Sequence, residues 1–208
     1  MNAKTAVIFG ENEYAFEIKK NIETGYEKLY VFGLDKASEH CFDLSDDWDD
    51  LRTKINMSEC TVFCVLEDIA QNVFLTISLR DTFPDLSIVA LSSDKESADK
   101  LLLAGATRVL PSIQTTANII VDMLEKPIIT KVFHNILYEK SDLKIAQITM
   151  NDSSIFDGKC PTDIEWSREH GIVIISLVHE DSTHEFIYSS GLTHNVIKSG
   201  DTFVVVGY

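Results

Sequence analysis

The run VIFGENEYA at 7–15 constrains this chain more than any other segment, because it joins an apolar strand to a helix start through Gly10. Dinucleotide-binding folds carry G-x-G-x-x-G or G-x-G-x-x-A at this junction. Here Asn12 replaces the second glycine, and Ala15 takes the third position. Two carboxylates also fall in a loop that normally attracts anions, Glu11 and Glu13. The run predicts a nucleotide-binding scaffold whose ligand contacts are weakened or changed.

Short β-rich runs alternate with helical patterns over the first 125 residues. This alternation predicts an α/β fold with a doubly wound, Rossmann-like parallel sheet that binds ligands at the carboxyl ends of its strands. The expected strands are 4–9, 28–33, 61–66, 87–91 and 107–110, with a short one at 40–42. The expected helices are 13–24, 46–56, 68–82, 94–104 and 112–125. We expect Ser45, Asp94 and Ser112 to cap helix N-termini and Gly105 to end a helix.

Pro127 ends this block, and a short helix with a dense apolar stripe follows at 128–137. The stripe comprises Ile128, Ile129, Val132, Phe133, Ile136 and Leu137. It either packs against its own domain or docks a second subunit. Strand and turn patterns then take over, with apolar runs at 172–178 and 202–208. We expect three parts, which are a Rossmann-like domain at 1–126, a helix and linker at 127–143, and a small β-rich α+β domain at 144–208.

Charge and composition exclude two classes of partner. A net charge of −15 leaves no surplus of Lys and Arg to contact nucleic acid or an anionic membrane surface. Apolar runs such as IVIISLV are far shorter than the ~20 residues of a membrane span, so we expect no direct membrane insertion. The opening MNAKTAVIF enters a strand at once, which predicts no signal peptide. The four cysteines show no zinc spacing, so we expect reduced thiols and a cytosolic compartment.

The acidic run at 43–50 has two interpretations. Several carboxylates suit a divalent cation, which prefers oxygen ligands. Acids in the first turn of a helix capped by Ser45 complement its dipole instead, and we favour this interpretation. The six histidines show no metal-binding spacing, and no Ser-His-Asp order or Cys-His pair stands out. We therefore expect no metal site and no catalytic residue, and we do not expect an enzyme.

Six segments in order carry a resemblance over the whole chain. In the first half they are the glycine loop at 7–15 with Asp35 after the next strand, DLSDDWDDL at 43–51, VLEDIAQNVFLTISLRDTFPD at 65–85 and ALSSDKESADKLLLAGATRVLPS at 90–112. In the second half they are SIFDGKCPTD at 154–163 and IKSGDTFVVVGY at 197–208. Together these segments resemble the RCK family (regulator of potassium conductance), which combines a TrkA-N domain with a TrkA-C domain.

The resemblance implies a cytosolic sensor that assembles into a dimer or an octameric ring. Such rings lie beneath a potassium channel or a Trk/Ktr-type transporter, at the inner face of the plasma membrane. The helix at 128–137 occupies the position of the family's crossover helix. The assembly residues implied by this position are Ile129, Val132, Phe133 and Ile136.

The resemblance also implies a nucleotide site. Its residues are Gly10, Asn12 and Ala15 at the phosphates, Asp35 at the ribose, and Asp43 and Leu44 at the adenine. The candidate cofactors are adenine nucleotides, namely AMP, ADP, ATP or NAD. Because Asn12 hinders close backbone approach and the two loop glutamates repel phosphate, we expect NAD to bind weakly or not at all.

Two alternatives stay open. The chain is either a ligand-responsive regulator or a ligand-free structural ring subunit, and the degenerate loop suits the second. An NAD-linked oxidoreductase on the same fold is the other alternative. The small second domain argues against an enzyme, since it leaves little room for a substrate domain. The chain is expected to be either a separate subunit or the cytosolic portion of a longer channel.

Overall fold

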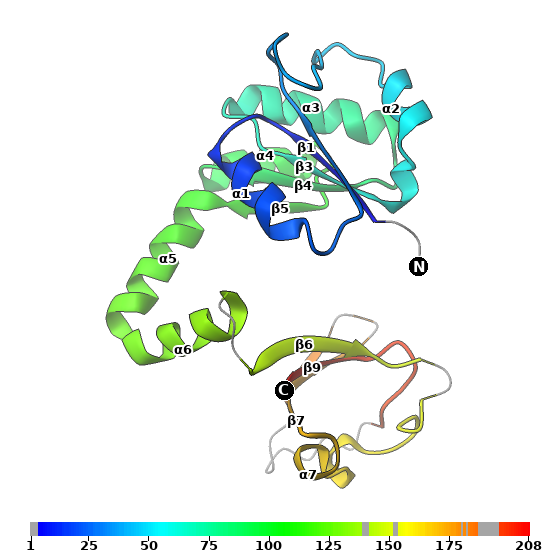
Figure 1. Cartoon of the computed structure of the whole chain (residues 1–208), viewed down its shortest axis with the longest axis vertical. Coiled ribbons are helices and arrows are strands. Elements are labelled where there is room, and N and C mark those ends of the chain that lie inside the picture. Colours follow the sequence, from blue (N-terminus) through cyan, green and yellow to red (C-terminus); the bar gives the residue numbers. More distant parts are fainter. Residues whose placement is uncertain (1–3, 139–141, 152–153, 180, 182, 187–195) are drawn as a thin grey trace. The chain divides into compact units, whose positions relative to one another are not determined.

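The structure, a computed structural model, describes residues 4–138, 142–151, 154–179, 181, 183–186 and 196–208. The chain forms two units, Met1–Val121 and Asp122–Tyr208. Their boundary lies inside one long helix, α5 (Ser112–Glu125), which is drawn in green in Figure 1. The limits expected from the sequence for the Rossmann-like domain, the helix with its linker, and the second domain stay predictions.

Five parallel strands form the sheet of the first unit, in the order β2-β1-β3-β4-β5. They are β1 (Thr5–Phe9), β2 (Lys28–Phe32), β3 (Cys60–Cys64), β4 (Ser87–Ser92) and β5 (Arg108–Pro111). Strand β1, which lies between β2 and β3, is buried throughout, and its Phe9 pairs in register with Phe32 and Cys64. The short strand expected after β2 is reduced to a single parallel bridge between Gly33 and Cys41. The sheet confirms the predicted α/β fold class.

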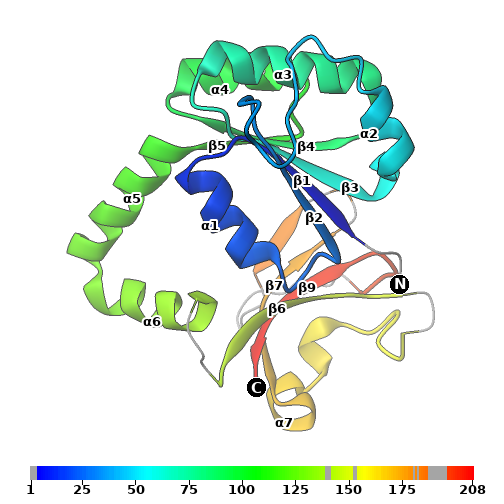
Figure 2. The same ribbon diagram turned by 45° about the horizontal axis from the view of Figure 1, so that its top comes forward.

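Helices cover both faces of this sheet (Figure 2). They are α1 (Glu13–Ile22), α2 (Asp49–Lys54), α3 (Ile69–Thr82) and α4 (Lys95–Leu103), with a short 3₁₀ turn at Met57–Glu59. Leu51, Leu79 and Leu101 from α2, α3 and α4 belong to one buried cluster with alternate residues of the strands. Ala15 of α1 packs with Ile8 in a second cluster on the opposite face. Between the two layers of helices, loops border the carboxyl ends of the strands.

The predicted start of the helix at 46–56 is wrong, because α2 begins only at Asp49. Ser45 does not cap it, since the Ser45 N–H and hydroxyl both donate to Oδ1 of Asp43, at 2.8 and 2.7 Å. These bonds hold the pKa of Asp43 below its usual range. Trp48 precedes the helix with a φ of 62°, and its indole N–H is anchored on α3. Side-chain bonds to nearby backbone therefore outcompete the expected helical turn.

Two of the other predicted helix ends are confirmed and one is wrong. Asp94 caps α4, because its Oδ1 accepts the N–H of Ser97 at 2.8 Å. Gly105 follows α4 with a φ of +103°, a left-handed conformation that suits glycine at a helix end. Ser112 is instead the first residue of α5, and its hydroxyl donates to the backbone carbonyl of Ser92 at 3.1 Å.

Two consecutive helices, α5 and α6 (Pro127–Tyr138), expose large apolar side chains. Among their described residues none is fully buried. The exposed side chains are Ile113, Ile119, Ile120, Val121, Met123 and Leu124 on α5, and Ile128, Ile129, Val132, Phe133, Leu137 and Tyr138 on α6. Ile136 is partly buried. The helix expected at 128–137 is confirmed, with Pro127 at its first position, where proline is well tolerated.

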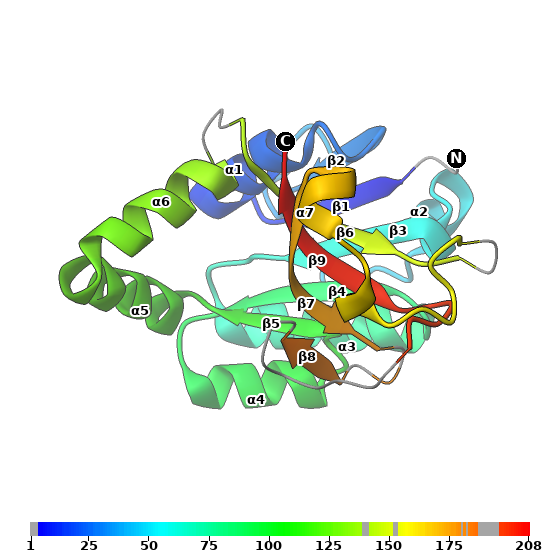
Figure 3. The ribbon, with the colours of Figure 1, turned by 90° about the horizontal axis from the view of Figure 1, so that it is seen from below.

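The second unit is built on an antiparallel sheet in the order β6-β9-β7-β8. Its elements are β6 (Lys144–Thr149), β7 (Ile172–Val178), β8 (His184–Phe186), β9 (Thr202–Gly207), a 3₁₀ turn at Pro161–Asp163 and α7 (Trp166–His170). Figure 3 shows β9 between β6 and β7. Its buried core comprises Met150, Ile174, Leu177, Ile197, Phe203 and Val205. The two apolar runs predicted as strands are confirmed as β7 and β9.

A buried carboxylate holds the turn before β9. Oδ2 of Asp201 accepts the backbone N–H of Lys198 at 2.9 Å, and Oδ1 lies 3.0 Å from Nδ1 of His179. The pair ties the end of β7 to the start of β9. His179 therefore has a structural partner in Asp201.

The four cysteines are free thiols. Cys60 and Cys64 are buried in β3, and burial raises the pKa of each thiol to about 12. Within the residues that the structure describes, no helix combines the length and the hydropathy needed to cross a membrane.

Candidate functional site

The turn from β1 to α1 is shaped by Gly10. Its φ is +132°, and a Cβ at this position would lie 2.9 Å from the backbone oxygen of Val65. Its N–H donates to the carbonyl of Phe32 at 2.8 Å, so this amide is already used within the sheet. Glycine is therefore required both for the backbone conformation and for the close approach of β1 to β3.

Asn12 occupies the space that a glycine leaves open in dinucleotide-binding loops. Its Oδ1 accepts the N–H of Ala15 at 3.1 Å, which makes it the N-cap of α1. Its Nδ2 donates to the carbonyl of Val65 at 2.6 Å. One side chain thus caps the helix and fastens the loop to the end of β3. Ala15 itself is buried against the sheet, as its third motif position requires.

Glu11 fastens the same loop on its other side. Its carboxylate accepts a hydrogen bond from the hydroxyl of Ser38, which lies in the segment that follows β2. Both groups lie so close to Gly33 that a Cβ there would overlap them. The β1–α1 loop is therefore tied by side chains to the ends of both neighbouring strands.

An acidic hollow of about 460 Å³ opens beside this loop. It is lined by Gly10, Glu11, Asn12, Leu34, Asp35, Leu66, Glu67, Asp68 and Gln71. Four of these residues carry carboxylates, and the described lining contains no Lys, Arg or His. Asp68 also caps α3, because its Oδ1 accepts the N–H of Gln71 at 2.9 Å. Both helices that begin here are capped by the protein's own side chains, so one N–H at each N-terminus is already bonded within the chain.

The structure brings three of the six predicted nucleotide residues together and leaves three apart, of which Ala15 is buried against the sheet. Gly10, Asn12 and Asp35 line the acidic hollow. Asp43 and Leu44 are not among its described lining residues, since Asp43 bonds within its own loop and Leu44 packs against the main core. Their assignment to an adenine stays a prediction. Asp35 is exposed, and its Oδ1 accepts the N–H of Ala37.

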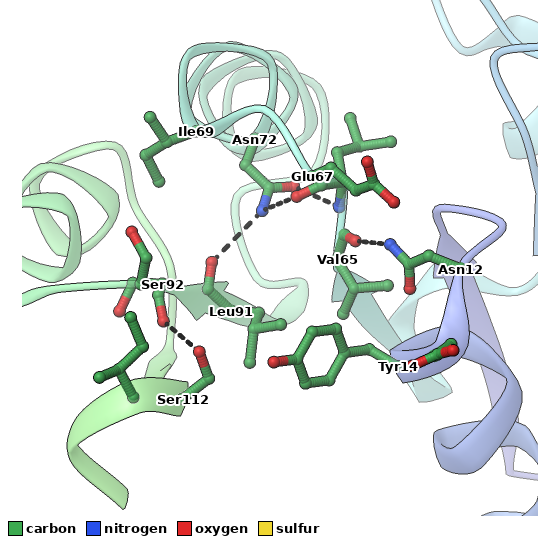
Figure 4. Close-up of a pocket in the computed structure, with 13 residues that line it drawn as sticks. Asn12, Tyr14, Val65, Glu67, Ile69, Asn72, Leu91, Ser92 and Ser112 are labelled. Carbon is green, nitrogen blue, oxygen red and sulfur yellow. Dashed lines mark hydrogen bonds between the residues drawn. The ribbon is translucent and has the colours of Figure 1, made fainter. Parts of the chain in front are cut away.

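A second hollow, which we call the serine hollow, has a volume of about 580 Å³ (Figure 4). It is lined by Asn12, Glu13, Tyr14, Val65, Leu66, Glu67, Ile69, Asn72, Leu91, Ser92, Ser93, Ser112 and Ile113. Figure 4 shows the ring of Tyr14 extending from α1 toward Leu91 and Ser112. Ser92 is only 2% exposed, and its hydroxyl has no hydrogen-bond partner among the described residues.

Asn72 connects the chain at the carboxyl ends of β3 and β4, beside the serine hollow. Its side chain is 1% exposed and bonds only to backbone. Oδ1 accepts the N–H of Leu66 at 3.0 Å, while Nδ2 donates to the carbonyls of Leu66 and Leu91 at 3.2 and 3.3 Å. It thereby links the β3–α3 and β4–α4 segments, and keeps the hollow in one shape.

No metal-binding group is found in the part of the chain that the structure describes. There, no three His, Cys, Asp or Glu side chains gather closely enough to hold an ion. The acidic residues after β2 are instead engaged in local turns, as Asp43 and Asp46 show.

Sequence reasoning missed the serine hollow and the bond between Glu11 and Ser38. Ser92 stands directly after the apolar run of β4, and a small polar residue at that place was the available signal. The contact of Glu11 had no comparable signal, because its partner lies 27 positions away in the sequence and the bond depends on how the chain between them folds.

The chain is similar to a domain family, to a channel protein and to several solved structures. Residues 47–112 match the TrkA-N domain family. "Potassium channel protein 1" of Methanocaldococcus jannaschii is 25% identical over 156 residues, which are 75% of this chain and 45% of that relative. The chain therefore spans about half the length of the relative.

Solved structures with the same fold include channel domains. The human SLO3 gating ring has a TM-score of 0.67 at 10% identity, over 98% of this chain and 44% of that one. The GsuK channel bound to NAD has a TM-score of 0.53 at 17% identity, over 100% of this chain and 37% of that one. The GsuK RCK domain has a TM-score of 0.51 at 16% identity, over 98% and 44%. Residues 47–112 are thus similar to a TrkA-N domain, and the chain shares its fold with these solved channel domains.

Proposed function

We propose that this chain belongs to the RCK/TrkA-N family, is a regulatory domain of a potassium channel or of a Trk/Ktr-type transporter, and acts by ligand-dependent conformational change. The observation that carries this proposal is similarity to a potassium channel protein over 75% of the chain. The ligand cleft at the strand ends and the exposed apolar helices α5 and α6 support it. The domain works at the cytoplasmic face of the membrane, where its channel partner holds it.

Regulation requires that a ligand bind one conformation more tightly than another. The β1–α1 loop is a suitable element, because Asn12 ties it to β3 and Glu11 ties it to the segment after β2. A ligand that breaks or reinforces these ties changes how α1 is held against the sheet. Tight binding alone shifts nothing if both conformations bind equally.

The cleft is proposed to bind NAD weakly. One solved channel with this fold is described as bound to NAD. In this chain the space for a pyrophosphate holds the Asn12 side chain, and four carboxylates line the acidic hollow. Two unit charges a few ångströms apart at a protein surface repel by an amount on the order of 1 kcal/mol or more. An adenine nucleotide other than NAD faces the same charges.

Assembly is proposed to use the apolar face of α6. Ile129, Val132 and Phe133 are each about half exposed, at 55%, 50% and 49%. With Ile136 they follow the i, i+3, i+4, i+7 spacing of one helical face. A homodimer through α6, extended into a ring, would bury this surface. The second unit is proposed to act as the TrkA-C domain.

A ligand-free structural ring subunit is the second candidate. The self-capped α1 favours it, because a loop closed by its own side chains needs no ligand to be complete. Its distinguishing result is stable assembly with no response to any cleft ligand. An enzymatic role in the acidic and serine hollows is disfavoured, since their described residues include no His or Cys to pair with a nucleophile.

Potassium flux in the native host tests the proposed function. The variant Phe133→Asp places a charge on the assembly face, and Lys131→Asp places the same side chain on the opposite face of α6. We expect Phe133→Asp to alter the rate of potassium or rubidium uptake and Lys131→Asp to leave it unchanged. Equal uptake in wild type, both variants and a deletion strain would contradict a role in potassium transport.

A further inference from the structure

A third hollow, which we call the aromatic hollow, lies along the edge of the first sheet. It has a volume of about 620 Å³, and its lining includes Tyr30 and Phe32 of β2 and Leu51 of α2. Strand β2 ends the sheet on this side, and beyond it the described chain adds only the bridge between Gly33 and Cys41. The described lining shares no residue with the acidic or the serine hollow. Its volume is typical of sites that bind small molecules.

Five aromatic side chains line the aromatic hollow, those of Tyr30, Phe32, His40, Phe42 and Trp48. The ring centroid of His40 lies 5.8 Å from that of Tyr30 and 5.3 Å from that of Phe32. These three residues are partly exposed, whereas Phe42 and Trp48 are buried in the main core. The rings that solvent reaches are therefore neighbours. Because the face of an aromatic ring carries negative charge, such a group of rings attracts cations.

Carboxylates share the aromatic hollow with these rings. Four exposed lining residues carry them, namely Glu39, Asp46, Asp47 and Asp49, and the described lining contains no Lys or Arg. Asp46 and Asp47 each accept a backbone N–H, at 2.9 and 3.2 Å, which orients the carboxylates and leaves their charge in place. Asp49 lies 3.8 Å from Arg52 in an exposed ion pair. The charge that remains in the hollow favours a positively charged ligand.

The combination of rings and carboxylates favours an organic cation over a metal ion. A metal ion needs several converging ligands, and no three His, Cys, Asp or Glu side chains gather in this way among the described residues. A cationic nitrogen that carries carbon groups is weakly hydrated, so it leaves water for an aromatic surface at small cost. In the described part of the chain, the protein's own cation–ring contacts join Arg52 to Phe83 and Lys159 to Phe156, outside the hollow.

We infer that the aromatic hollow binds a small organic cation, of the alkylated ammonium or guanidinium class. Its carbon groups contact the rings of Tyr30, Phe32 and His40, and its charge faces the carboxylates of Glu39 and Asp46. This site goes beyond the proposed function, because it is separate from the strand-end cleft and needs no nucleotide there.

Calorimetric titration of the full chain at pH 8 with two matched pairs tests the inference. Choline is paired with 3,3-dimethylbutan-1-ol, which has the same shape without the charge, and methylguanidinium is paired with methylurea. We expect at least one cation to bind about tenfold or more tighter than its neutral match, a difference of about 1.4 kcal/mol or more. Equal binding within both pairs overturns the inference. So does the lack of any cation binding at millimolar concentration.

Substitution of a ring tests the placement of the cation. Tyr30→Leu removes an aromatic face and keeps an apolar side chain, so it should weaken cation binding about fivefold or more. Tyr14→Leu is the matched control, because Tyr14 lines the serine hollow and should leave the affinity unchanged. If Tyr30→Leu lowers the melting temperature, His40→Ala repeats the test at the neighbouring ring. An equal loss of affinity in Tyr14→Leu and Tyr30→Leu overturns the placement.

Substitution of a carboxylate tests the role of charge. Glu39→Gln keeps the size of the side chain and removes its charge, so it should weaken cation binding about threefold and leave the neutral matches unaffected. Glu27→Gln makes the same change outside the hollow and should leave cation binding as in the wild type. Unchanged cation affinity in both Glu39→Gln and the ring variant, each with the melting temperature of the wild type, overturns the inference.

Discussion

The side-chain amide of Asn12 donates a 2.6 Å hydrogen bond to the backbone carbonyl of Val65, while its oxygen caps α1. A residue that replaces a phosphate-binding glycine thus uses both polar atoms on the protein itself. The contact joins β1 to β3 at the point where strands of this fold present ligands. We propose that these bonds of Asn12 replace the phosphate contacts that a dinucleotide-binding loop makes at this position.

Replacing Gly10 by alanine should destabilise the first unit strongly. The φ of +132° disfavours any side chain, and the new Cβ would lie 2.9 Å from a backbone oxygen. We expect the free energy of unfolding to fall by about 2–4 kcal/mol. Gly158→Ala is the control, because Gly158 has a φ of +74° with no heavy atom within 4 Å of a built Cβ. Urea unfolding measures both, and equal losses would show that the close approach is not important.

Asn72→Ala should also destabilise, by about 2–4 kcal/mol, since it leaves buried backbone groups without partners. The groups affected are the N–H of Leu66 and the carbonyls of Leu66 and Leu91. Asn21→Ala on the exposed face of α1 should change stability by only about 0.5 kcal/mol. A small effect at Asn72 in urea unfolding would mean that water or rearrangement replaces its bonds.

Phe133→Asp should reduce the oligomeric state of the purified chain. Burying a carboxylate in an apolar interface is costly, so the charged variant disfavours association. Sedimentation velocity measures the change, with Lys131→Asp as the matched variant off the apolar face. An unchanged sedimentation coefficient in Phe133→Asp would show that α6 is not the interface.

Stability should fall in alkaline solution because of the buried thiols. Burial raises the pKa of Cys64 from 9.0 to about 12, so the folded state keeps its proton where the unfolded state loses it. Its stabilising contribution is complete below pH 9 and is lost as pH rises toward 12, by about 1.4 kcal/mol per pH unit. Urea unfolding of wild type and Cys64→Ala across this range isolates the effect. Parallel pH profiles for the two proteins would contradict it.

The parallel sheet was predictable because short apolar runs, such as AVIF in β1 and IVAL in β4, alternate with helical patterns. Such runs are typical of strands covered on both faces, as β1 is. The apolar stripe of α6 was likewise visible from its spacing alone, although exposure rather than burial of that stripe needed the structure.

The rest depended on contacts that local sequence does not specify. The start of α2 was misplaced because Asp43 takes both donors of Ser45, and a helical pattern does not show this competition. The role of Glu11 required the segment after β2 to fold back onto the loop. Ser92 became informative only once its neighbours proved to offer it no partner.

Calorimetric titration with NADH of the wild type, Asn12→Gly and Asn21→Gly tests the central claim most directly. If the Asn12 side chain blocks the phosphate position, the wild type and Asn21→Gly bind NADH weakly or not at all. Asn12→Gly should then bind about tenfold or more tighter. Micromolar binding of NADH by the wild type, unimproved by Asn12→Gly, would contradict the claim that the chain's own side chains replace the phosphate contacts.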